Sequence, residues 1–75
     1  PGSYTGYFEN EHGEQSVFLY DRETHKGTLW MGDYGWEHPD EVLAGKVPEL
    51  ILDDEERDWL RLCWLVATSH EPTVL

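Results

Sequence analysis

The side chains of this sequence that are best suited to bind a ligand are acidic residues next to glycines. The segment "GDYGWEHPDE", residues 32–41, carries four carboxylates and two glycines, and "ENEHGE", residues 9–14, surrounds another glycine with acids. Carboxylate and backbone oxygens are the ligands that calcium prefers in proteins. Neither segment has the ligand spacing of an EF-hand loop. The sequence therefore predicts a non-EF-hand calcium site assembled from separate loops.

The first of these segments also has a structural interpretation, as the start of a short helix. Pro39 suits the first helical position, Asp40 and Glu41 would complement the helix dipole in the first turn, and Gly45 would end the helix. This interpretation does not account for Asp33, which follows a predicted strand. We keep both interpretations and predict that the metal ligands come from one set of carboxylates: Asp33, Glu37, Asp40, Glu41, Glu11 and Glu14.

The charge balance restricts the classes of partner. Sixteen acids face five bases, which gives a net charge of −11. Binding to nucleic acids or to anionic membranes needs a basic surface, so the composition argues against both. Calcium ions and basic proteins remain as partners. The sequence contains no apolar run of about 18 residues and no signal-peptide pattern, so we expect a cytoplasmic protein.

The first half of the chain has the pattern of a sheet. Residues 3–10, 15–21 and 28–33 are rich in aromatic and β-branched residues, and the two connections contain Gly13 and Gly27. We predict a three-stranded antiparallel meander. In a meander the loop before the second strand lies at the same end of the sheet as the end of the third strand. This would bring Glu11 and Glu14 toward Asp33.

The second half has the pattern of a helix. Asp53 and Glu56 are spaced as a capping box, and several apolar residues then recur at helical spacing: Trp59, Leu60, Cys63, Trp64 and Ala67. Further apolar residues widen this face, so we expect the helix to be buried on most of its circumference and packed on the sheet. Residues 50–52 are either a short strand or a plug into the core.

These elements predict a single α+β domain over residues 1–75, in which the meander packs against the C-terminal helix and a short helix lies between them. Residues 1–3 resemble a remnant of cloning, and residues 70–75 are expected to be a loose tail. Cys63 is the only cysteine, so the chain forms no internal disulfide. Its apolar neighbours predict a small buried side chain. A single buried cysteine indicates a reducing compartment.

Patterns typical of enzymes and of zinc sites are missing from the sequence. It has no phosphate-binding glycine loop, no HExxH and no GxSxG, so we expect no enzymatic activity. The four histidines are scattered beside one cysteine, without zinc-ligand spacing. The aromatic residues offer an alternative function: Trp30 is expected in the core, whereas Trp36, near Tyr34, is the better candidate for an exposed patch with an acidic rim.

The two acidic segments "GDYGWEHPDEV" and "LDDEERDWLRLCWL" resemble the cyanobacterial calcium-binding protein family associated with heterocyst differentiation. The resemblance implies a cytoplasmic calcium-sequestering protein with surface sites of carboxylate and backbone oxygens. It implies no enzymatic activity. Our leading hypothesis is therefore a calcium buffer. The alternative is an acidic protein-interaction module that mimics nucleic-acid charge and binds a basic partner.

Overall fold

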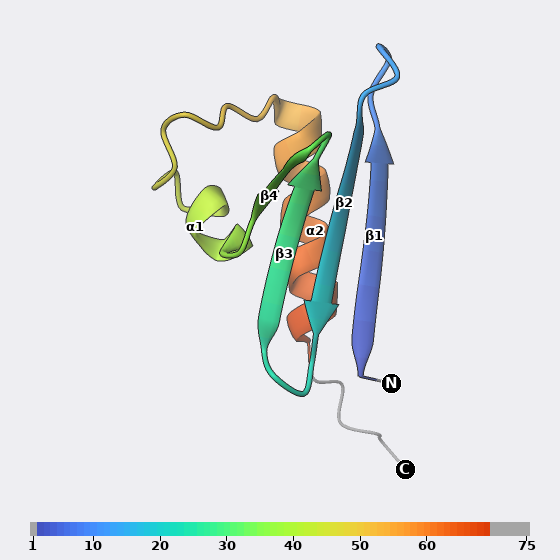
Figure 1. The fold of residues 1–75 in the computed structure, drawn as a ribbon, viewed down its shortest axis with the longest axis vertical. Helices are drawn as coiled ribbons and strands as arrows, with labels where there is room; N and C mark the ends of the chain where they lie inside the picture. Colours follow the sequence, from blue (N-terminus) through green and yellow to red (C-terminus); the bar gives the residue numbers. More distant parts are fainter. Residues whose placement is uncertain (1, 70–75) are drawn as a thin grey trace.

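The first half of the chain, in which successive residues point to opposite faces, forms one antiparallel sheet (Figure 1). The structure is a computed structural model that describes residues 2–69. The strands are β1 (Ser3–Glu9), β2 (Gln15–Asp21), β3 (Lys26–Met31) and β4 (Tyr34–Trp36), and they lie in the order β1-β2-β3-β4. Neighbours in the chain are therefore neighbours in the sheet, as in the predicted meander.

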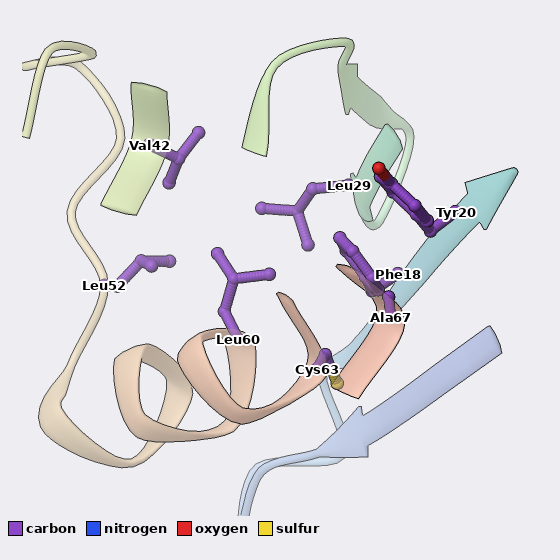
Figure 2. Packing of buried hydrophobic residues seen from close by; sticks show 8 residues of the cluster. All are labelled: Phe18, Tyr20, Leu29, Val42, Leu52, Leu60, Cys63 and Ala67. Atoms are coloured by element: carbon purple, nitrogen blue, oxygen red, sulfur yellow. The ribbon is translucent and has the colours of Figure 1, made fainter. Parts of the chain in front are cut away.

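Helix α2 (Asp54–Thr68) covers one face of the sheet, which we call the inner face (Figure 1). Leu60, Cys63 and Ala67 project from one side of this helix and are buried against the sheet. Figure 2 shows the resulting core, which consists of Phe18, Tyr20, Leu29, Val42, Leu52, Leu60, Cys63 and Ala67. The predicted α+β class is confirmed.

The two helix starts follow the predicted signals. The side chain of Asp53 accepts a hydrogen bond of 2.8 Å from the backbone N–H of Glu56, which caps α2. Helix α1 (Pro39–Leu43) begins with proline, and Gly45 follows it with φ +74°. Only glycine adopts this left-handed conformation without strain, which explains why the helix ends there.

The number of strands was predicted wrongly, because the sheet has four strands and not three. Gly32 and Asp33 form a two-residue loop, and β4 then pairs with β3 from Met31↔Tyr34 to Leu29↔Trp36. Gly32 has φ +61°, which suits the first loop position of a tight hairpin. With three residues, one of them Gly35, β4 is too short to produce a recognisable alternating pattern.

The first described residues take part in the fold. Residues 2 and 3 belong to the fold: Ser3 is the first residue of β1, and the Gly2 carbonyl accepts a hydrogen bond of 2.7 Å from the Arg22 N–H. The predicted tail, residues 70–75, lies outside the described residues. Residues 50–52 were predicted to form either a short strand or a plug into the core. They form no strand, and Leu52 is buried in the core, whereas Ile51 is exposed.

Helix α2 is less buried than expected. Leu62 and Leu65 are 59% and 63% exposed, and Val66 is exposed as well. These residues lie on the side of the helix that faces away from the sheet, where no other layer of the described chain covers them. The expectation of burial around most of the helix was therefore wrong, because a two-layer domain buries only one side of its helix.

The single cysteine is a core residue, as predicted. Cys63 is 3% exposed, and its Sγ lies so close to Gly6 of β1 that a side chain at Gly6 would collide with it. Burial raises the pKa of the Cys63 thiol above its usual value. A protonated, buried thiol is a packing group and a poor nucleophile.

Candidate functional site

The two acidic turns lie at the same end of the sheet, as the meander predicts. Ser16 of β2 pairs with Met31 of β3, and the Gly32 N–H donates a hydrogen bond of 3.4 Å to the Gln15 carbonyl. The turn with Asp33 is therefore next to the loop between β1 and β2, which contains Glu11 and Glu14. All three of these acids are exposed: Asp33, Glu11 and Glu14.

The other three predicted ligands lie farther along the sheet. Strand β4 runs back along β3. The four residue steps from Asp33 to Glu37 therefore span about 13 Å along the strand, at roughly 3.3 Å per residue. Glu37 and Asp40 line a surface pocket together with Lys26 at the start of β3. Glu41 is exposed on α1. The helix-start acids and Asp33 thus face different regions of the surface.

Within residues 2–69, no three His, Cys, Asp or Glu side chains are grouped so that they could hold one metal ion. Both acidic turns have structural explanations. Asp33 completes the β3–β4 hairpin loop. In the other turn, Asn10 Oδ1 accepts hydrogen bonds of 2.9 Å from the backbone N–H groups of His12 and Glu14. Calcium binding by the predicted residues stays a prediction.

Sequence reasoning missed Glu56 as a functional candidate. Glu56, Glu14, Ser16 and Gly32 line one cavity of about 380 Å³ at this end of the sheet. Burial is the main reason why the pKa of Glu56 is raised, and the charges of Asp53 and Glu14 raise it further. The helical spacing offered a signal, because Glu56 lies four residues before Leu60 on the buried side of α2.

The outer face of the sheet, opposite α2, carries a row of apolar side chains. Tyr7, Val17 and Trp30 are cross-strand neighbours in the register of β1, β2 and β3, and Leu19 lies in the adjacent row. Tyr7 is 54% exposed, Leu19 41% and Trp30 43%. We call these four residues the outer patch. Its members project from three strands, so the sheet holds them in fixed relative positions.

The exposure of the tryptophans is the reverse of the prediction. Trp30 belongs to the outer patch, whereas Trp36 is half-buried and packs against the core. Tyr34 is exposed, but it lies next to Trp36 on the inner side of the sheet, with ring centroids 6.3 Å apart. Tyr34 pairs with Met31, the residue after Trp30 in β3. Because successive residues of a strand point to opposite faces, Trp30 and Tyr34 lie on opposite faces of the sheet and do not form one patch.

Carboxylates flank the outer patch. Glu9 ends β1, where its Oε1 accepts a hydrogen bond of 3.2 Å from the Tyr7 hydroxyl. Asp21 ends β2 and holds the next turn, because its Oδ1 accepts from the backbone N–H of Glu23 at 2.8 Å. The outer patch therefore has a carboxylate at each end of the strands, and Lys26 of β3 lies opposite Asp21.

Three of the five basic side chains are engaged away from this patch. Arg57 and Arg61 form ion pairs within α2, with Asp54 at 3.0 Å and with Asp58 at 3.2 Å. Arg22 donates hydrogen bonds to the carbonyls at the end of α2. Lys26, by contrast, is the cross-strand neighbour of Asp21 and lines a surface pocket with Asp21 and Leu19, so the negative potential beside the outer patch is strongest at Glu9.

Comparisons with protein-family models, curated proteins and solved structures found no match for this chain. The resemblance to the calcium-binding family accordingly remains a prediction. In the described part of the chain, no helix has the length and apolar character that a transmembrane span requires.

Proposed function

We propose that the protein is an acidic protein-interaction module that binds a basic partner through the outer patch. The observation that carries the proposal is the row Tyr7, Val17 and Trp30, which is held on a sheet face that α2 does not cover. Rigid, partly exposed aromatic side chains with a polar rim are typical of the energetic centre of a protein interface.

The charge of the molecule supports a basic partner. A net charge of −11 on 75 residues creates a strong negative potential, which accelerates the approach of cations and repels other acidic proteins. Glu9 places part of this potential at one end of the outer patch, whereas at the other end Asp21 lies opposite Lys26. A partner with an apolar centre between basic groups would match both features. The buried Cys63 is consistent with a reducing, cytoplasmic location.

The proposal is tested with a synthetic peptide that has lysines at both ends and alternating valine and threonine between them, hereafter the probe peptide. Isothermal titration is compared for the wild type, Trp30→Ala and Tyr34→Ala. Trp30→Ala should weaken binding by about tenfold, the effect of losing one aromatic anchor. Tyr34→Ala removes an exposed aromatic from the other face and serves as the matched control. Equal losses in both variants, or no binding to the wild type, would contradict the proposal.

As a second candidate function we propose that the protein is a calcium buffer, which binds the ion at the end of the sheet where the two acidic turns lie. The supporting observation is that Glu14 and Glu56 line one cavity and that the charge of Glu14 contributes to the raised pKa of Glu56. A divalent cation between them would relieve this repulsion. Open sites of this kind are expected to bind calcium with dissociation constants of about 10⁻⁷ to 10⁻⁵ M or weaker.

Calcium titration of two variants separates this location from the one predicted from the sequence. Glu56→Gln should reduce the binding heat if calcium sits between Glu14 and Glu56, whereas Asp33→Asn should reduce it if the hairpin turn supplies the ligand. Glu49→Gln, which removes the charge of an exposed acid outside the predicted ligand set, is the control. Absence of heat and of thermal stabilisation at about millimolar calcium would rule out this second function.

A further inference from the structure

Among the residues that the structure describes, strand β1 forms a free edge of the sheet. It is first in the strand order, and Figure 1 shows no described segment on the side away from β2. Its pairing with β2 is continuous from Ser3↔Asp21 to Glu9↔Gln15. Proteins often protect such an edge with lysine, proline or a bulge. The sequence of β1, SYTGYFE, contains neither residue, and its register contains no bulge.

The hydrogen-bond pattern shows which backbone groups point off this edge. Gly2 accepts from Arg22, and Asn10 donates to Glu14, so these two pairs are hydrogen-bonded ones. Hydrogen-bonded pairs alternate along an antiparallel ladder, so the even-numbered residues of β1 bond to β2. The odd-numbered residues direct their N–H and C=O groups outward: Ser3, Thr5, Tyr7 and Glu9.

The same odd-numbered residues carry their side chains on the outer face. Tyr7 thus contributes its ring to the outer patch and its backbone groups to the free edge. A strand that paired with β1 would place alternate side chains beside Tyr7. The free edge and the outer patch would then form one continuous binding surface.

Both ends of the edge are acidic. At the start of β1 the Glu23 carboxylate lies against Gly2, since a Cβ on Gly2 would be 3.1 Å from Glu23 Oε2. At the other end lies Glu9. The two ends are about 24 Å apart, from a rise of roughly 3.4 Å per residue. A second copy of this chain would bring its own acids and a net charge of −11 to the same edge, so the charge favours a basic segment as occupant.

We propose that β1 accepts an extended basic segment of the partner as a fifth strand. The segment is about seven residues long, to match β1, with cationic side chains at both ends and apolar or β-branched side chains beside Tyr7. This inference rests on the proposed interaction function, because it specifies how the basic partner binds.

Amide hydrogen exchange of the 75-residue chain, with and without the probe peptide, tests this mode of binding. The peptide should protect the outward N–H groups of Thr5 and Tyr7. Those of Tyr4 and Gly6, which already face β2, are the internal control. A probe peptide with N-methylated amides keeps every charge and side chain but cannot donate ladder hydrogen bonds. Its affinity should be lower on the order of a hundredfold, since several hydrogen bonds are lost.

On the protein side, Thr5→Pro removes one outward N–H without removing a bond to β2, and Thr5→Val keeps that N–H. Only the proline variant should bind the probe peptide more weakly. If both probe peptides bind equally well, or if Thr5 and Tyr7 gain no protection, strand addition is refuted while the interaction function stands. If neither peptide binds, both proposals fail. Self-association of the wild type through β1 would overturn the choice of occupant.

Discussion

The indole of Trp30 lies against the backbone of Gly35 across the β3–β4 pair. A Cβ on Gly35 would be 2.9 Å from Cζ3 of Trp30 and about as close to two other ring atoms. The absence of a side chain at Gly35 therefore fixes where Trp30 can lie on the outer face. A glycine that looks like a loop residue in the sequence thus helps to shape the proposed binding surface.

Gly35→Ala should displace the Trp30 ring. We expect a shift of the Trp30 indole N–H resonance and a loss of stability of about 1 kcal/mol, at the lower end of overpacking costs because Trp30 is partly exposed. The double variant Gly35→Ala/Trp30→Ala should lose less than the sum of the two single variants in urea unfolding. Strict additivity would show that the two residues are not coupled.

The cap of α2 gives a second prediction. Asp53→Ala should lower the free energy of unfolding by about 1 kcal/mol, because the Glu56 N–H loses its acceptor. Asp58→Ala, which breaks an exposed ion pair with Arg61, should cost less than this, within the range of about 0 to 1 kcal/mol. Chemical denaturation of both variants measures the difference, and a larger loss for Asp58→Ala would contradict the assignment of the cap.

Parts of this fold could be predicted because their causes are local. Asp53 predicts the start of α2, and Pro39 and Gly45 predict the two ends of α1, because capping depends on a few neighbouring residues. Strand β4 could not be predicted in this way, because three residues with a central glycine become a strand only when β3 pairs with them. The pairing partner, which lies elsewhere in the chain, decides the structure of such a segment.

The candidate site was harder to predict for a related reason. Trp30 and Trp36 both lie at strand positions, and only the register shows which of them faces α2 and which faces outward. The capping-box position of Glu56 already explained this residue, so its place in the cavity with Glu14 was not predicted. Acid–glycine turns are ambiguous, because hairpin loops and calcium ligands use the same residues.

The protonation of Glu56 predicts a specific pH dependence. A raised pKa in the folded protein means that the ionised form is disfavoured there, so ionised Glu56 lowers stability at neutral pH. The penalty is relieved as the pH falls through the raised folded-state pKa toward the unfolded value near 4.5. Glu56→Gln should therefore be more stable than the wild type near neutral pH.

This advantage of Glu56→Gln should shrink as the pH falls toward about 4.5. Unfolding free energies of the wild type and the variant across this range are the measurement. Glu55→Gln, in the same helical turn but exposed, is the control for general relief of the net negative charge. An equal gain in both variants would show that burial of Glu56 has no role.

The two sides of α2 should respond differently to substitution. Leu60→Ala removes a fully buried side chain and should cost about 2–5 kcal/mol. Leu62→Ala removes an exposed side chain two positions away and should change stability by roughly 0.5 kcal/mol or less. Thermal or urea unfolding compares them, and a large loss for Leu62→Ala would mean that a further layer covers this side of the helix.

The central claim, that the outer patch binds a basic partner, is tested most directly by mapping the probe peptide on the ¹⁵N-labelled wild-type chain by NMR. The proposal predicts that the largest shifts, weakening at high salt, fall on Tyr7, Val17, Leu19 and Trp30. Shifts spread evenly over the acidic surface, or concentrated on the exposed side of α2 at Leu62 and Leu65, would contradict it.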